Sequence, residues 1–349
     1  MVSDIKVSIK NLYKIFGSDP ASVLDHAKSG MSKADLLEKH GHVLGLKDVN
    51  IDIEARGIQV IMGLSGSGKS TLIRHINRLI EPTSGEIVID GQDVLAMSDD
   101  ELTDFRRFRA SMVFQKFGLL PHRTVQDNAA YGLTIQGMDK QEAIEKSSYW
   151  VKRVGLAGFE NHYPAQLSGG MQQRVGLARA LATDAEILLM DEAFSALDPL
   201  IRTDMQDVLL DLQNELHKTI IFITHDLDEA LRIGDDIAIL RDGAVIQQGT
   251  PQEIVLNPAD DYVRDFIKDI NRARVLEVNS VMESKKPRSG VKVDKAMVIE
   301  EALQIATANE NKPLIVTEDG KAIGSVTLDA MIAAIARPEK DAERNPEYR

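Results

Sequence analysis

Short apolar runs alternate with amphipathic stretches along residues 1–272 of this 349-residue chain. The runs are bounded by glycine or charged residues, which is typical of strands buried within a sheet. We expect strands at 58–62, 86–90, 111–115, 187–191, 219–224 and 236–240. Helical spacing follows most of them, notably at 71–79, 170–182 and 200–216. The alternation predicts a mixed α/β domain.

Two segments interrupt this pattern. Residues from about 119 to 166 are mostly helical, and we expect them to form a subdomain inserted into the α/β core. Between Phe16 and Gly45 lies a second insert, in which Ser32 and Asp35 form a capping pattern that predicts a short helix. Insertions usually lie at the surface, so we interpret the second insert as an elaboration without chemistry.

The sequence changes character after residue 272. Residues 273–290 include Pro287 and Gly290 and are interpreted as a linker. Residues 291–336 predict a small β-α-β-β-α unit with a turn at Gly320. The charged segment 337–349 is expected to be a disordered tail.

Composition narrows the function classes. Apolar runs are far shorter than the roughly 18 residues of a membrane span, and the N-terminus lacks a secretory pattern. The chain has 0 cysteines, which excludes disulfides and cysteine-based zinc sites and suits a cytoplasmic protein. A net charge of −13 and the lack of long Lys/Arg runs argue against nucleic-acid binding.

A glycine-rich loop follows the predicted strand 58–62 and precedes a helix. It fits the G-x-x-x-x-G-K-[ST] pattern, in which backbone N–H groups and the helix N-terminus surround phosphate oxygens. We expect Lys69 to reach the β- and γ-phosphates of ATP and the Ser70 hydroxyl to bind Mg²⁺. The residues assigned to nucleotide binding here are Gly63, Ser65, Gly66, Ser67, Gly68, Lys69, Ser70 and Thr71.

Two acids end the apolar strand predicted at 187–191. Asp191 is expected to hold Mg²⁺ through water, and Glu192 to polarise the attacking water as a general base. Acids also end strands simply because they prefer solvent. The phosphate loop favours the catalytic interpretation, because this pair completes a P-loop NTPase site.

Residues 167–172 read LSGGMQ and precede a helical pattern. They resemble the signature motif of ABC ATPases; Ser168 is a predicted N-cap and the glycines expose N–H groups to an anion. The resemblance implies the ABC nucleotide-binding fold, with a mixed sheet core and an inserted helical subdomain. It also implies that Gln115 is the Q-loop residue touching Mg²⁺ and water, and that His225 is the switch histidine contacting the γ-phosphate.

An aromatic residue stacks on adenine in this family. Phe16 is the candidate, and Tyr13 competes for that role. In the family, the signature of one subunit also faces the phosphate loop of a second copy, so ATP closes a homodimer. The residues implied to contact ATP across the interface are Ser168, Gly169, Gly170, Gln172 and Asp198.

Within the ABC family the chain is similar to the ATPases of glycine betaine/proline betaine importers. The insert at 16–45 and the segments 77–82, 191–202 and 224–230 carry this likeness. It implies uptake of an osmoprotectant or quaternary amine, with choline and proline as close relatives. The implied partners are a membrane permease, received near residues 116–128, and indirectly a periplasmic or extracellular solute-binding protein; the implied location is peripheral, on the cytoplasmic side of the cell inner membrane.

Two other function classes agree less well with the sequence. A soluble ABC ATPase acting on DNA or ribosomes typically has two cassettes or long coiled coils, whereas this chain has one phosphate loop and an acidic balance. A metabolic P-loop kinase would have no use for the signature or for His225.

Residues 278–336 resemble a single CBS motif. The acid expected three residues after Thr327 is replaced by Ala330, and Asp329 lies one place early, which puts adenosine binding in doubt. A structural or dimerising module and a regulatory sensor of ionic strength are both left open.

Overall fold

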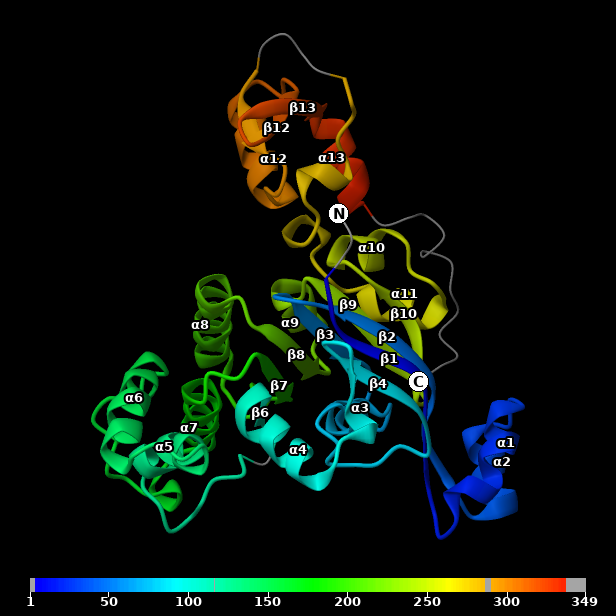
Figure 1. The fold of residues 1–349 in the computed structure, drawn as a ribbon. Coiled ribbons are helices and arrows are strands. Elements are labelled where there is room, and N and C mark those ends of the chain that lie inside the picture. Colours follow the sequence, from blue (N-terminus) through cyan, green and yellow to red (C-terminus); the bar gives the residue numbers. More distant parts are fainter. Residues whose placement is uncertain (1–3, 116, 286–289, 337–349) are drawn as a thin grey trace. The chain divides into compact units, whose positions relative to one another are not determined.

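The computed structural model describes residues 4–115, 117–285 and 290–336 (Figure 1). Lys116, part of the linker at 286–289 and the predicted tail at 337–349 lie outside the described residues. The chain forms two compact units, 1–248 and 249–349. The predicted ATPase domain extended to 272, and thus includes two helices that cluster with the second unit.

A six-stranded sheet forms the core of the first unit, in the order β10-β9-β3-β8-β7-β6. Its strands from β9 to β6 run parallel. Every residue of β3, β7 and β8 is buried, which explains their continuous apolar sequences. The strands are β3 (Ile58–Met62), β6 (Ala110–Val113), β7 (Ile187–Asp191), β8 (Thr219–Thr224), β9 (Asp236–Arg241) and β10 (Ala244–Gly249). The predicted strand at 111–115 is therefore too long, because β6 ends at Val113 and Gln115 lies in the loop beyond it.

A second sheet of four strands has the order β2-β1-β4-β5 and is antiparallel. Its strands are β1 (Ile5–Phe16), β2 (Val43–Glu54), β4 (Ser84–Ile89) and β5 (Gln92–Asp93). Helix α3 (Lys69–Ile76) contributes Leu72, Ile73 and Ile76 to one apolar core shared with both sheets. This core fixes the phosphate loop, which lies between β3 and α3.

Helices α5 (Val125–Ile135), α6 (Lys140–Arg153) and α7 (Gly169–Ala182) pack on one another (Figure 1). The predicted helical subdomain at 119–166 contains α5 and α6, and α7 packs against both. The remaining elements of the first unit are η2 (Val94–Ala96), α4 (Asp99–Asp104), the π-helical turn η3 (Phe105–Arg109), η4 (Pro164–Gln166), α8 (Pro199–Leu216) and α9 (Leu227–Ile233).

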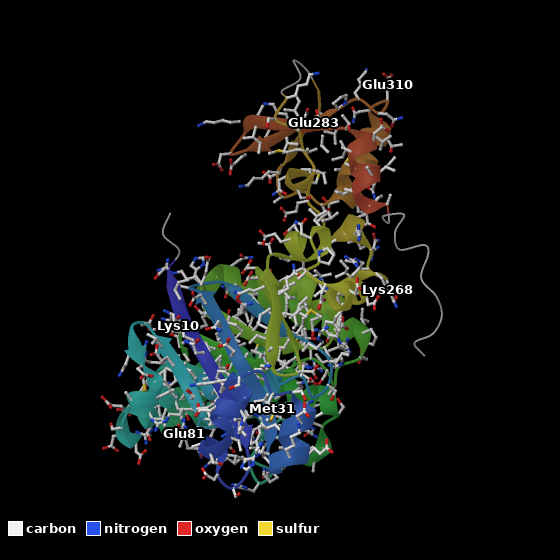
Figure 2. All side chains as sticks on the ribbon, turned by 90° about the vertical axis from the view of Figure 1, so that its right-hand side faces the viewer. Lys10, Met31, Glu81, Lys268, Glu283 and Glu310 are labelled. Carbon is white, nitrogen blue, oxygen red and sulfur yellow. The ribbon has the colours of Figure 1, made fainter. Side chains whose placement is uncertain are left out.

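The insert between β1 and β2 folds into η1 (Pro20–Val23), α1 (Leu24–Lys28) and α2 (Lys33–His40). Ser32 caps α2 by accepting a hydrogen bond from the Asp35 N–H at 3.0 Å, so the predicted helix and its cap are confirmed. The insert has its own small core, whose buried members are Tyr13, Ile15, Val23, Ala27, Leu36 and Leu44. Met31, labelled in Figure 2, packs against this core just before α2 begins.

The second unit begins with α10 (Pro251–Leu256), α11 (Asp261–Ile267), η5 (Arg272–Arg274) and η6 (Val278–Ser280). A three-stranded sheet follows, β11-β12-β13, in which β11 and β12 are parallel and β12 and β13 antiparallel. The elements are β11 (Lys292–Asp294), α12 (Ile299–Ala308), β12 (Leu314–Glu318), β13 (Lys321–Val326) and α13 (Leu328–Ile335), in the predicted β-α-β-β-α order. In the part of the chain that the structure describes, no helix combines the length and apolar character of a membrane span.

Candidate functional site

The loop from Gly63 to Gly68 turns tightly at three glycines with positive φ, at Gly63 (153°), Gly66 (79°) and Gly68 (105°). A Cβ on Gly63 would lie 2.2 Å from the carbonyl oxygen of Leu240 on the neighbouring strand β9. A side chain cannot fit there, so the glycine is needed for the loop to leave the sheet. The loop leads directly into α3, whose N-terminus favours an anion.

Lys69 is the first residue of α3 and is buried. Its ammonium donates to the carbonyl oxygens of Gly63 at 2.8 Å and Leu64 at 3.1 Å. Burial lowers the pKa of Lys69, and the carboxylates of Glu192 and Asp191 oppose that shift. The cation is therefore desolvated and held inside the loop, where phosphate oxygens can replace the carbonyl partners.

Asp191 ends β7 and is fully buried. One carboxylate oxygen accepts from the Ser70 hydroxyl at 2.7 Å, and the other accepts from Arg74 at 3.1 Å. A hydroxyl and a carboxylate are hard oxygen ligands of the kind that Mg²⁺ takes beside nucleotide phosphates. The chemistry of the pair therefore fits the predicted ion. The described residues contain no group of three or more acids, histidines or cysteines that could hold a metal.

Glu192 follows Asp191 and has a positive φ of 49°, a left-handed conformation that is uncommon for a residue other than glycine. Its carboxylate accepts from the Gln115 amide at 2.7 Å and lies 3.6 Å from Nδ1 of His225. The structure thus brings together the three predicted catalytic residues, which come from the ends of β6, β7 and β8.

A cavity of about 330 Å³ lies over the loop. Phe16 lines it with 41% of its surface exposed, and its ring lies so close to Gly45 that a Cβ there would be 2.6 Å from it. Tyr13 is only 6% exposed and packs inside the core of the insert. Of the two aromatic candidates, Phe16 is therefore the one available to a base. The lining residues are Phe16, Lys33, Val43, Leu44, Gly45, Ser65, Gly66, Gly68, Lys69, Ser70, Thr71, Gln115 and Glu192.

The signature residues lie elsewhere in the chain. Ser168 caps α7 by accepting from the Met171 N–H at 3.3 Å, and the Gln172 amide donates to the Leu167 carbonyl at 3.3 Å. Gly169 begins α7, and a Cβ on Gly170 would meet Leu197 at 2.9 Å, so the signature packs against the segment that precedes Asp198. Asp198 caps α8. None of these five residues is among the described residues that line the cavity.

Sequence reasoning missed two residues at the site, Arg74 and Lys33. Arg74 lies one helical turn after Ser70 and pairs with Asp191. Lys33 belongs to the insert predicted to be without chemistry, yet lines the cavity. Only the structure brings Lys33 to the site, since no local pattern marks it. Beside the site, Arg202 bridges the Asp226 carboxylate at 3.0 Å and the Leu197 carbonyl at 3.4 Å.

Comparisons with known proteins agree with this geometry. The family model described as ABC transporter matches residues 46–195. The glycine betaine/proline betaine transport system ATP-binding protein ProV of Escherichia coli is 48% identical over 96% of this chain and 84% of its own length. The chain belongs to the ABC transporter ATP-binding proteins. The glycine betaine transport ATP-binding protein OpuAA of Bacillus subtilis is 54% identical over 83% of this chain and 69% of its own length. These likenesses confirm the predicted family, fold class and function as a transporter ATPase.

A solved structure is also similar to this ABC protein. It is a dimeric ATP-binding cassette in a post-hydrolysis state bound to ADP and Pi, 34% identical, with a TM-score of 0.61 over 70% of this chain and 98% of that one.

Proposed function

We propose that this ABC protein hydrolyses ATP to drive import of an osmoprotectant or quaternary amine through a partner permease. The observation that carries the proposal is the convergence of Lys69, Ser70, Asp191, Glu192 and Gln115 around one loop and cavity. The solute class is supported by the relatives, whose names give glycine betaine and proline betaine in Escherichia coli and trimethylamine N-oxide in Pelagibacter ubique.

The side chains divide the reaction among them. Lys69 and the loop N–H groups bind the terminal phosphates and stabilise the charge that develops there. Glu192 orients and deprotonates the attacking water, and Gln115 fixes its carboxylate through the 2.7 Å hydrogen bond. His225 lies 3.6 Å from the other oxygen of that carboxylate, which supports a role as the switch histidine that contacts the γ-phosphate. Mg²⁺, bound at Ser70, Asp191 and Gln115, would neutralise phosphate charge.

A second copy of the chain completes each site. Ser168 and Asp198 are exposed and therefore accessible to a partner chain, and so are Leu64 of the phosphate loop, at 57%, and Leu200 of α8, at 72%. The similar cassette bound to ADP and Pi is dimeric, which supports pairing of the same kind here.

The permease docks in a groove of about 530 Å³ beside the loop after Gln115. The groove is lined from both the sheet core and the helical subdomain, by residues that include Leu79, Phe114, Tyr131, Ile135 and Arg179. Leu79 and Ile135 are 46% and 45% exposed, so the groove offers apolar surface to a helix. Arg179 donates to the carbonyls of Gly118 and Phe117, which ties α7 to the segment that follows Gln115. The protein would thus lie on the cytoplasmic side of the inner membrane, while a solute-binding protein delivers solute from the other side.

Reconstitution tests the whole proposal. The chain and its permease, placed in vesicles with the solute-binding protein, should hydrolyse ATP faster when glycine betaine is added than when an equal concentration of sucrose is added. Co-purification with nucleic acid or ribosomes, together with ATPase activity that no quaternary amine changes, would instead support the soluble ABC ATPase alternative.

A further inference from the structure

We propose that Lys33 of the insert is a nucleotide-binding residue whose ammonium contacts the phosphate chain of bound ATP. The inference rests on the proposed ATP site and deepens it. It also gives the insert a chemical role, in place of the surface elaboration that its sequence suggests.

Lys33 lies at the rim of the phosphate loop. Its Nζ is 3.5 Å from the carbonyl oxygen of Gly66, and the residue lines the same cavity as Phe16 and Lys69. Phe16 is the proposed surface for the base and Lys69 the proposed ligand of the terminal phosphates, so a cation beside Gly66 shares the cavity that would hold the whole nucleotide. The hydrogen bond to Gly66 is long and weak, so the ammonium can turn to a stronger acceptor.

Packing of the insert fixes the position of the Lys33 backbone. The buried Leu36 of α2 packs with Ile15 of β1 and Leu44 of β2, close to Phe16 and Gly45 on the same strands. The Ser32 cap sets the first turn of α2. The backbone of Lys33 is therefore held by the strands that form the base-binding part of the cavity.

Local stability does not explain a lysine at this position. Lys33 is the first residue of α2, where the helix dipole disfavours a positive charge. Among the described residues no carboxylate forms an ion pair with it, whereas Lys39 of the same helix pairs with Asp35 at 3.0 Å. An unpaired cation at a helix N-terminus, on the rim of an anion-binding loop, is suited to a phosphate ligand.

Nucleotide binding to the full-length chain tests the inference. Titration calorimetry with Mg-ADP, which lacks the γ-phosphate that joins two copies, isolates the site of one chain. We expect Lys33→Ala to raise the Kd for ADP roughly five- to tenfold, as for loss of one partly exposed charge contact. Lys33→Glu should raise the Kd for ADP further, whereas the Kd of Lys33→Arg should stay within about twofold of the wild-type value. Added salt should reduce the difference in Kd between Lys33→Ala and the wild type, because salt screens the charge contact.

Lys39→Ala is the matched control, since it removes a lysine from the same helix away from the cavity. Lys69→Ala tests the proposed site itself. Equal ADP affinity of Lys33→Ala and the wild type, with affinity lost in Lys69→Ala, overturns the role of Lys33 alone. A wild type that binds no ADP overturns the proposed site instead. Equal circular dichroism spectra and thermal midpoints show that the Lys33 variants keep the overall fold, and binding of adenosine, which lacks phosphate, should not differ among them.

Discussion

The carboxylate of Glu192 has two polar partners, and each comes from a different strand end. Gln115 donates to one oxygen at 2.7 Å and His225 lies 3.6 Å from the other. Both partners keep their places if the carboxylate becomes an amide of the same shape, so the base can be removed without disturbing the cavity.

Glu192→Gln should therefore bind ATP and lose hydrolysis. We expect a fall in kcat of roughly 10²- to 10⁴-fold, the contribution of a general base. Because ATP then persists, the variant should accumulate as an ATP-dependent dimer, measurable by size-exclusion chromatography with light scattering. Asp228→Asn is a suitable control, since it removes an exposed carboxylate from the first turn of the neighbouring helix α9. Unchanged phosphate release from Glu192→Gln would refute its role as base.

Phe16, rather than the buried Tyr13, is the aromatic residue expected to stack on adenine. Phe16→Ala should weaken ATP binding by roughly 5- to 150-fold, because base stacking on an aromatic ring contributes about 1–3 kcal/mol. Phe16→Trp should retain affinity. Tyr13→Leu, which removes the ring but keeps an apolar side chain in the core of the insert, should leave ATP affinity unchanged, because Tyr13 is buried there. Fluorescence titration with a labelled ATP checks both, and a loss of affinity in Tyr13→Leu with none in Phe16→Ala would reverse the assignment.

For helices and strands, the sequence predicts the boundaries best where an element is buried along its whole length. The strands β3, β7 and β8 are buried along their whole length, so their apolar runs begin and end with the strands. The strand at 111–115 was predicted too long because Phe114 continues the apolar run after the hydrogen bonds of β6 stop at Val113. The position of Lys33 depends on how the insert folds back onto β1 and β2, and a contact over 33 residues leaves no local pattern.

Helices α8 and α9 share a buried acid. Glu229 of α9 is 6% exposed and accepts from Gln206 of α8 at 3.0 Å. Burial raises the pKa of Glu229 above its ordinary value of 4.5, more than its hydrogen bonds lower it. The folded state thus keeps a proton that the unfolded chain has released, and stability is lost as the pH rises through the folded pKa.

Glu229→Gln mimics the protonated acid and should escape that loss. Relative to the wild type, its free energy of unfolding should increase from pH 5 towards neutrality, by about 1.4 kcal/mol for each unit by which the pKa is raised. Urea unfolding at a series of pH values measures the difference. Glu215→Gln, an exposed glutamate of α8, should show no such trend. A difference that stays constant with pH would mean that Glu229 has an ordinary pKa.

At the scale of the whole molecule, residues 291–336 form the β-α-β-β-α part of the second unit. Thr327 accepts from the Ala330 N–H at 3.1 Å as the N-cap of α13, and Asp329 lies exposed in the first turn of that helix. Both residues thus have local roles in starting the helix, which favours a structural or dimerising module. Deletion of 276–349 should leave the response of transport to ionic strength unchanged. Loss of that response in a truncated chain that still hydrolyses ATP would identify the module as a sensor.

Pairing of two copies predicts that two defective chains restore each other. Lys69→Ala disables the phosphate loop, and Ser168→Asp keeps the N-cap of α7, since aspartate caps as well as serine, while placing a negative charge against phosphate. A homodimer of either variant has two defective ATP sites and should be inactive. A mixed dimer has one site in which both defects meet and one in which neither occurs. Equal amounts should therefore recover about a quarter of wild-type ATPase activity, because half of the dimers are mixed and each has one of two sites intact. If mixing restores nothing, while the wild type and a tagged second copy still pair in ATP, Ser168 does not act on the partner's nucleotide.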